Sequence, residues 1–261
     1  MENKLCFVLG AGGARGISHI GFLQVMEENG IKPDCIAGCS MGSVVGACYA
    51  NGMKPIDMMK IVEELKFQDI VDVSPFPFTK KSILHSVKLR NKLESVIGNV
   101  EFKDLKIPFE CVAADIASGR LITLKEGSVA EAVRASSAIP AVFHPVERDG
   151  MVLVDGALYM SLPMNCVSDF GANKVVVVDV LGKLRPYKPT KNILDHILRM
   201  VDANTYFLAK RHLHAFKHDV LIRPDLGDMS QYKVEKLHFA YEQGYKAGIE
   251  NLPKIKKILD K

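Results

Sequence analysis

The stretch Leu5-Cys-Phe-Val-Leu-Gly-Ala-Gly-Gly-Ala-Arg-Gly16 decides the fold of this 261-residue chain. Its first five residues form a continuous apolar run, which is typical of a parallel β-strand buried on both faces. After the glycine cluster, apolar residues recur at helical spacing over 17–29, and Gly30 stands where a helix cap belongs. The chain therefore opens with a strand, a glycine-rich loop and a helix.

A second motif lies about thirty residues further on, in the pentapeptide Gly38-Cys-Ser-Met-Gly42, which has the pattern G-x-S-x-G. It lies between a short apolar run at 35–37 and a helical stretch at 43–50. A sharp turn from strand to helix strains the corner residue, and side chains two positions before and after it would collide with the backbone. Ser40 would lie near the positive end of the helix, where negative charge is stabilised. This context favours a nucleophilic serine over a Gly/Ser turn without chemistry.

A strand, a glycine loop and a helix also open a dinucleotide-binding site, so this alternative has to be weighed. The signature G-x-G-x-x-G does not fit in register, because Gly16 comes one residue too late after Gly10 and Gly12. The acidic residue expected after the second strand is replaced by the Ser40 pentapeptide. Arg15 would pair with a phosphate on either interpretation, or with a nearby carboxylate.

A nucleophilic serine needs a group that takes its proton, and histidine is the usual candidate. None of the eight histidines follows a late strand as expected for an α/β-hydrolase, and only His144, between two prolines, is held in reserve. Three others lie in a polar helical stretch and do not form a metal site, because no acidic third ligand is evident. They are His212, His214 and His218.

Aspartate is the alternative proton acceptor. The apolar run Met151-Val-Leu-Val-Asp155 ends in Asp-Gly-Ala, and the turn before it predicts a hairpin with 141–143 or with Val146. An aspartate at the end of a strand, followed by small residues, approaches another segment closely, although Asp-Gly is also a common turn dipeptide. Asp115, the second aspartate considered, stands in a hairpin instead.

These three segments, in this order and spacing, resemble the patatin-like phospholipase family, and more narrowly its bacterial members related to the neuropathy target esterase catalytic domain. The resemblance is strongest over residues 4–52, extends to about 180 and is weak after that. It implies a three-layer α/β/α fold with a mainly parallel central sheet. It also implies a serine hydrolase of lipid carboxylic esters that forms an acyl-enzyme without a cofactor or metal.

The resemblance assigns a role to each motif. Ser40 is expected to be the nucleophile, and Asp155 the group that orients and deprotonates it. The oxyanion hole is expected to consist of backbone N–H groups of Gly12, Gly13 and Ala14. Arg15 would help to hold the shape of this loop. The supporting residues of the two turns and the loop are Gly10, Arg15, Gly16, Gly38, Gly42 and Gly156.

Composition narrows the class of protein. Lys and Arg number 34 against 30 Asp and Glu, a mild excess that permits contact with anionic lipid surfaces. No basic patch with interleaved aromatic residues stands out, so we expect no nucleic-acid partner. Six cysteines in apolar runs without a C-x-x-C pair indicate free thiols, hence a cytoplasmic protein or one peripheral to a membrane. The chain leads straight into its first strand, so we expect neither a signal peptide nor a membrane span.

The remaining segments predict one domain over residues 1–261, with its motifs within 4–180 and a helical portion at 190–261. Residues 109–115 and 120–124 read as paired strands, and residues 128–137 as a helix that Ser128 caps. Further strands are expected at 174–180 and 220–222, with a long helix at 192–217 between them. The Pro-Phe-Pro-Phe stretch at 75–78 reads as a loop that fills a satellite core, or as a lid over the site.

Two alternatives stay open. One is a nucleotide- or acyl-carrier-binding α/β module without hydrolase chemistry, and the other is a Ser-His-Asp hydrolase that uses His144. The nature of the ester and the oligomeric state are not predicted.

Overall fold

The computed structural model describes residues 3–64, 72–73, 84–85, 87–187 and 189–260. Among these residues the strands are β1 Leu5–Leu9, β2 Cys35–Gly38, β3 Asp72–Val73, β4 Leu84–His85, β5 Phe109–Asp115, β6 Arg120–Leu124, β7 Val146–Arg148, β8 Met151–Asp155, β9 Lys174–Val178 and β10 Val220–Ile222. The α-helices are α1 Ser18–Glu28, α2 Met41–Ala50, α3 Pro55–Glu64, α5 Val87–Ile97, α6 Val129–Ser136, α7 Ala157–Met160, α8 Cys166–Asp169, α9 Ile193–Ala215 and α10 Leu237–Leu259. A 3₁₀ turn, Gly13–Ile17, leads into α1.

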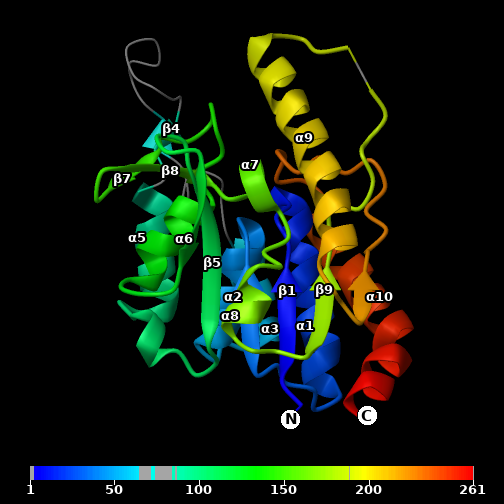
Figure 1. The fold of residues 1–261 in the computed structure, drawn as a ribbon. Helices are drawn as coiled ribbons and strands as arrows, with labels where there is room; N and C mark the ends of the chain where they lie inside the picture. The colour runs from blue at the N-terminus through cyan, green and yellow to red at the C-terminus, as the bar shows by residue number, and fades with distance from the viewer. Residues whose placement is uncertain (1–2, 65–71, 74–83, 86, 188, 261) are drawn as a thin grey trace.

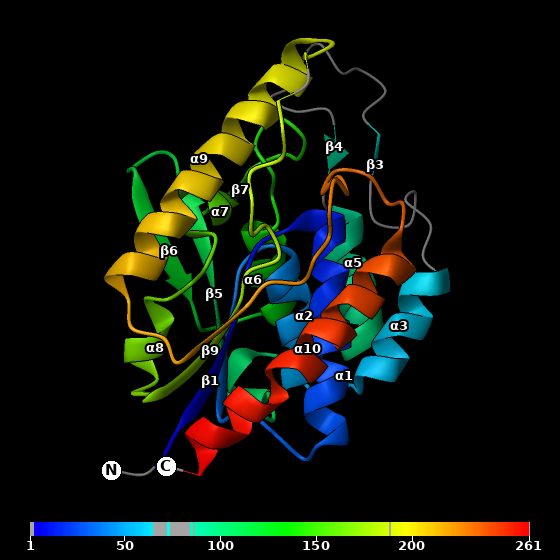
Figure 2. The same ribbon diagram turned by 90° about the vertical axis from the view of Figure 1, so that its right-hand side faces the viewer.

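The central sheet has the strand order β10-β9-β1-β2-β5-β8-β7, with β6 paired to β5. Its pairs are parallel from β10 to β5 and antiparallel where β5 meets β6 and β8 and where β8 meets β7. Helices cover both faces of this sheet (Figures 1 and 2). The predicted α/β fold with a mainly parallel central sheet is therefore confirmed.

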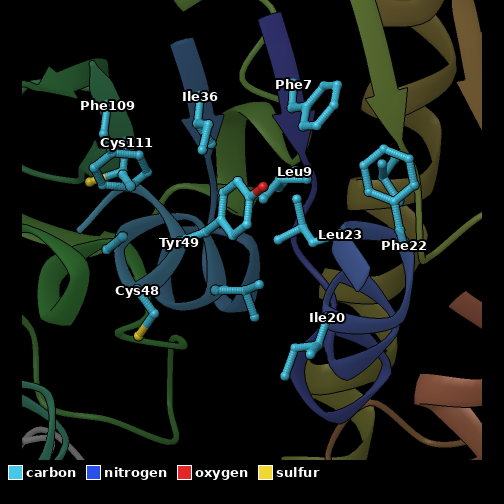
Figure 3. Close-up of a cluster of buried hydrophobic side chains, with 14 of the residues drawn as sticks. Phe7, Leu9, Ile20, Phe22, Leu23, Ile36, Cys48, Tyr49, Phe109 and Cys111 are labelled. Carbon is cyan, nitrogen blue, oxygen red and sulfur yellow. The ribbon is translucent and has the colours of Figure 1, made fainter. Parts of the chain in front are cut away.

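The strand residues alternate between two apolar layers because successive side chains point to opposite faces. Leu5, Phe7 and Leu9 belong to the larger core, which includes residues of α1, α2 and α10. Phe7 packs edge-on against Phe22 of α1, with ring centroids 5.2 Å apart, as Figure 3 shows. The alternating residues Cys6 and Val8 belong to a smaller core with parts of α8 and α9.

The last helix holds the first one in place. In Figure 2, α10 lies across α1, and glycines at the crossing bring the two backbones close together. A Cβ atom on Gly244 of α10 would collide with the carbonyl oxygen of Ser18, and one on Gly21 of α1 would collide with that of Tyr241. Because α1 follows the glycine loop directly, this contact also supports the loop.

Strand register brings two distant segments together. On β5, Gly38 at the end of β2 pairs with Cys111, whereas Asp155 at the end of β8 pairs with Ala113. The two partners are two residues apart on one strand, which corresponds to about 7 Å. The carboxyl ends of β2 and β8 are therefore neighbours, although more than a hundred residues separate them in the chain.

Most expected elements form where the residues predicted them. Of the two hairpin partners considered for the strand at 151–155, the structure pairs Val146 with Leu153 and does not use 141–143. Ser128 caps α6 by accepting a hydrogen bond from the Glu131 amide. The Pro-Phe-Pro-Phe stretch at 75–78, expected over the site or in a satellite core, lies outside the described residues. In the described part of the chain, no helix has the length and apolar character that crossing a membrane requires.

Candidate active site

The turn between β2 and α2 holds Ser40 in a strained conformation. Its φ is 52° and its ψ is −123°, a combination that costs a non-glycine residue on the order of 1–3 kcal/mol. Side chains on the two flanking glycines would not fit, because a Cβ on Gly42 would strike the carbonyl oxygen of Leu9 and one on Gly38 would lie 2.6 Å from the Cα of Ser43. The turn thus has the geometry that the pentapeptide predicts.

Two further serines hold this turn. The backbone N–H of Ser40 donates to the hydroxyl of Ser136 at the end of α6 (3.0 Å), and the hydroxyl of Ser43 donates to the Ser40 carbonyl (2.6 Å). The backbone at Ser40 is therefore satisfied on both sides, which leaves its hydroxyl to other partners.

The hydroxyl of Ser40 points at Asp155. Its Oγ donates to Asp155 Oδ2 over 2.6 Å, and both side chains are buried. The other carboxylate oxygen accepts the Ala157 amide (2.9 Å) and the Cys39 thiol (3.9 Å). Gly156 packs so tightly that a Cβ there would strike the carbonyl oxygen of Val112. The carboxylate is therefore fixed in one orientation toward the serine.

Burial controls the charge of this carboxyl group. Desolvation raises the pKa of Asp155 from 3.8 to about 6, although hydrogen bonds from Ser40, Ala157 and Cys39 act in the opposite direction. A pKa near 6 leaves Asp155 mostly ionised at neutral pH, yet close enough to neutrality to hold a transferred proton.

The glycine loop lies beside the serine and is anchored by its own backbone. Gly10 donates to the Val178 carbonyl (3.1 Å) and Ala11 to the Ser161 carbonyl (2.9 Å). Gly13 has a φ of +49°, and a Cβ there would strike the carbonyl oxygen of Gln231.

The structure narrows the expected oxyanion hole. The amide of Ala14, which we expected to face the substrate, donates to the Gln231 carbonyl over 2.9 Å. The amides of Gly12 and Gly13 make no recorded hydrogen bond to any residue that the structure describes. Of the three amides expected in the oxyanion hole, those of Gly12 and Gly13 therefore remain as candidate donors. Gly16 closes the loop by packing against Met41, next to the serine.

Arg15 is buried behind this loop. Its side chain is 6% exposed, and its Nε has no hydrogen-bond partner among the described residues. Burial is the larger cause that lowers the pKa of Arg15, and the positive charge of Arg185 is the smaller one. Asp202 lies close enough to raise that pKa, and it accepts hydrogen bonds from Arg185 (2.8 Å) and from Tyr232 (2.6 Å). Arg15 thus sits at the edge of a polar network between α9 and the loop.

The imidazole groups lie elsewhere. Among the described residues, none of the hydrogen bonds of Ser40 involves a histidine. His144, held in reserve as a base, is half-buried, with Nδ1 3.3 Å from the Pro145 carbonyl. His19 is fully buried under the loop with Nε2 2.8 Å from the Gly10 carbonyl, and burial lowers its pKa to about 4, so it is neutral at pH 7.

Asp115 is occupied in its hairpin. Its carboxylate accepts hydrogen bonds from the amides of Ala117 and Val152 and from the Ser118 hydroxyl. No group of three or more potential ligands that could hold a metal ion occurs in the parts of the chain that are described.

Ser40 opens onto a cavity of about 410 Å³. Its walls are mostly aliphatic and come from α1, α2, α3, α5 and α9 and from segments after α6 and before α10. Polar lining residues are few and include Ser137, Tyr232 and two lysines, Lys92 and Lys233. Such a cavity suits an acyl chain next to a polar reacting group.

Sequence reasoning missed the residues that close the site from outside the three motifs. Ser136, Gln231 and Tyr232 lie in segments that carry no catalytic pattern, and only the folded chain brings them to the serine and its loop. A serine in the last turn of a helix or a glutamine in a loop is too common to be singled out.

The sequence of this chain matches a known protein family over most of its length. The model of the family described as "Patatin-like phospholipase" matches residues 7–165, more than half of the chain. The chain belongs to the patatin-like phospholipase family. The match spans all three motifs and ends before α9 and α10.

Curated members of the same group resemble the chain over about two thirds of its length. An uncharacterized NTE family protein of Mycobacterium tuberculosis is 34% identical over 179 residues, which is 69% of this chain and 49% of that protein. Lysophospholipase NTE1 of Cryptococcus neoformans is 34% identical over 69% of this chain and 12% of its own length. The human patatin-like phospholipase domain-containing protein 6 is 31% identical over 68% of this chain and 13% of its own length. The match thus spans about half or less of each relative.

Two solved structures share the patatin-like fold. VipD from Legionella pneumophila superposes with a TM-score of 0.62 at 14% identity, over 98% of this chain and 67% of its own. ExoU from Pseudomonas aeruginosa, in its complex with SpcU, gives a TM-score of 0.51 at 14% identity, over 97% of this chain and 52% of its own.

Proposed function

We propose that this protein is a serine hydrolase of lipid carboxylic esters that works through Ser40 and Asp155 and an acyl-enzyme intermediate. The observation that carries the proposal is the 2.6 Å hydrogen bond from the Ser40 hydroxyl to a buried carboxylate, at the wall of an apolar cavity. Membership of the patatin-like phospholipase family supports it, and the name of one relative, a lysophospholipase, points to lipid esters.

The chemistry follows from the geometry in two steps. Ser40 Oγ attacks the ester carbonyl carbon while its proton passes to Asp155, and the alcohol leaves with that proton. Water, deprotonated by the same carboxylate, then releases the acyl group from the serine. In both steps the free amides of Gly12 and Gly13 stabilise the oxyanion, and loss of one such donor typically costs about 3 kcal/mol of transition-state stabilisation.

The cavity indicates which part of the substrate is bound. Its aliphatic walls accept a hydrocarbon chain, whereas Lys92 and Lys233 are the cationic side chains on its lining within the described residues. A lipid ester whose acyl chain fills the cavity, with its polar part near the lysines, fits this distribution better than a small polar ester does.

The test is labelling with an active-site-directed fluorophosphonate together with hydrolysis of a panel of lipid esters. The wild-type protein should be labelled at Ser40 with one equivalent, and Ser40→Ala should neither be labelled nor hydrolyse any ester. Ser168→Ala is a matched control, since Ser168 is exposed and lies outside the three motifs. A wild-type protein that resists the probe would favour a binding module without hydrolase chemistry.

A histidine-dependent hydrolase is distinguished by one more variant. If Asp155 is the proton acceptor, His144→Ala should keep turnover within about twofold of wild type, whereas Asp155→Asn should reduce it by three or more orders of magnitude. The reverse pattern would overturn the assignment of Asp155.

We also propose that the enzyme acts in the cytoplasm and contacts a membrane surface transiently. All six cysteines are free and buried, as in proteins of reducing compartments. The exposed apolar residues Ile193, Met200 and Phe207 of α9 support the membrane contact.

A further inference from the structure

Helix α9 carries apolar side chains on the side that faces away from the protein. Ile193, Met200 and Phe207 are 74%, 61% and 58% exposed. They recur every seven residues, about two helical turns, so they form one stripe along the helix. Figures 1 and 2 show α9 as an outer element on one face of the sheet. A stripe of three large apolar side chains in water needs an explanation.

The charges of α9 are distributed unevenly around it. Arg211 lies eighteen residues after Ile193, which is five turns, so it shares the stripe, and its guanidinium lies 5.8 Å from the centre of the Phe207 ring. The two acidic residues of the helix are directed elsewhere. Asp202 is buried and bound to Arg185, and Asp195 accepts the backbone amide of Lys191 at the first turn.

The opposite side of the same helix belongs to the catalytic cavity. Leu194 and Leu198 line that cavity. Val234, in the segment before α10, also lines the cavity and is 52% exposed. One helix therefore separates the stripe from the space next to Ser40.

We propose that the α9 stripe, Ile193, Met200, Phe207 and Arg211, is the surface by which this protein binds an anionic lipid bilayer. Large apolar side chains next to cations, without a carboxylate from the helix, match the boundary between acyl chains and anionic headgroups. A second copy of the chain fits less well, because two such stripes would bring arginines together with no acidic partner. The proposal rests on the proposed lipid esterase function, whose substrate would then enter from the bilayer beside α9.

The test is sedimentation with vesicles, carried out on Ser40→Ala protein so that hydrolysis does not alter the lipid. Vesicles of phosphatidylcholine with phosphatidylglycerol should bind the protein, and pure phosphatidylcholine vesicles or high salt should weaken binding. Adding Met200→Ser and Phe207→Ser should weaken binding at least tenfold. Ile249→Ser is the matched control, because Ile249 is 45% exposed on α10, across the sheet.

A second readout separates this proposal from the proposed function. With Ser40 restored, the double variant should hydrolyse a short soluble ester at the wild-type rate and lose at least tenfold on vesicles. Equal vesicle binding by wild type and double variant would overturn the α9 stripe as the binding surface. A dimer in light scattering that the double variant loses would instead identify a second copy as the occupant. If the α9 stripe binds the bilayer but the proposed esterase function is wrong, the wild-type protein should bind vesicles and hydrolyse none of the esters.

An independent observation concerns Ser137, the residue after α6. Its side chain is 8% exposed, its Oγ has no hydrogen-bond partner among the described residues, and it lines the cavity together with Ser40. Its neighbour Ser136 binds the Ser40 amide, and the carbonyl of Ala138 accepts the Asp155 amide (2.9 Å). A buried hydroxyl that lacks a described partner, on a residue that lines the cavity, is available to a bound ligand.

The strand pairing indicates on which side of the site Ser137 lies. The glycine loop follows β1, which pairs with one edge of β2, whereas Asp155 ends β8, which meets the carboxyl end of β2 on the same edge of β5. Ser137 lies next to Ala138, whose carbonyl holds the Asp155 amide, so it is close in the chain to the segment that holds the carboxylate proposed to return the proton to the leaving alcohol.

We infer that Ser137 donates a hydrogen bond to the departing ester oxygen. The bond from Ser40 Oγ to the acyl carbon forms, the bond from that carbon to the alcohol oxygen breaks, and the proton that Asp155 took from Ser40 passes to that oxygen. Ser137 keeps its own proton and stabilises the oxygen while negative charge develops there. In the second step the attacking water occupies the same position.

Esters with different leaving groups test this role. Ser137→Ala should lower kcat/KM at least tenfold for an alkyl ester, but less than threefold for a p-nitrophenyl ester, whose leaving oxygen needs no donor. Ser137→Thr should restore the alkyl ester activity. Ser161→Ala, which removes another buried serine hydroxyl without a partner but outside the cavity lining, should affect both esters equally. Equal losses on both esters for Ser137→Ala, or no loss, would overturn the inference.

Discussion

Replacing Asp155 by asparagine should abolish hydrolysis and yet stabilise the folded protein at neutral pH. Asparagine has nearly the same shape, so its amide oxygen still accepts the Ala157 amide, and its NH₂ group donates to Ser40 in place of accepting from it. The substitution removes the charge of a buried carboxylate, which has no cation among the hydrogen-bond partners that the described residues supply.

The magnitude follows from the pKa of Asp155, which is about 6 in the folded protein against an ordinary value of 3.8. A carboxyl group whose folded pKa is raised contributes stability that is complete below 3.8 and is lost as the pH rises through 6. About two pKa units at about 1.4 kcal/mol each give a cost of about 3 kcal/mol at pH 7.5. Asparagine carries no such cost. The variant should therefore be more stable by about 3 kcal/mol at pH 7.5, and the difference should shrink to about 1 kcal/mol near pH 4.5.

The assay is urea denaturation followed by circular dichroism between pH 4.5 and 8, which needs no activity. Asp149→Asn is the matched control, because Asp149 lies in a neighbouring turn with its side chain 75% exposed, and it should change stability little at any pH. An Asp155→Asn protein that is no more stable than wild type at pH 7.5, or whose gain is independent of pH, would refute the reasoning about the buried charge.

Three further predictions concern the same site and its support. The kcat/KM for a soluble ester should fall about tenfold per pH unit below 6 as Asp155 becomes protonated, and a flat profile from pH 7 to 5 would contradict its role as base. Gly13→Ala should lower kcat/KM at least tenfold, because its φ is +49° and its Cβ would displace the Gln231 carbonyl; thermal denaturation separates this loss from unfolding. Gly244→Ala should lower the free energy of unfolding by about 2 kcal/mol or more, because its Cβ meets the backbone of α1. Gly248→Ala, which meets only the Val25 side chain at 3.0 Å, should cost less in the same urea titration.

Local patterns in the sequence predict the parts of the fold that depend on neighbouring residues. The apolar run of β1 and the Gly38–Gly42 pentapeptide each specify their own backbone, so the strand and the strained turn form where expected. The role proposed for Asp155 rests on the family resemblance, since an Asp-Gly dipeptide alone does not distinguish a turn from a catalytic position. The register of β2 and β8 on β5 explains physically why Ser40 and Asp155 lie in contact.

Contacts between distant segments could not be predicted in this way. The hairpin signal before β8 fits either 141–143 or Val146, and the choice depends on how the chain leaves α6, where Ala141 adopts a φ of +64°. The carbonyl that takes the Ala14 amide comes from Gln231, in a segment without any catalytic motif. A donor in a glycine loop has no sequence signal that says whether another part of the fold will bind it.

The bond between Ala14 and Gln231 has a consequence for biosynthesis. Ser40, Asp155 and the glycine loop all lie within the first 155 residues, yet the loop is braced by the carbonyl of Gln231, some seventy-five residues later. A ribosome-bound chain that already contains Ser40 and Asp155 still lacks this carbonyl and the helix that crosses α1. A lipid-cleaving centre would therefore become competent only after residue 231 has been made, so that shorter translation products remain harmless to the membranes around them.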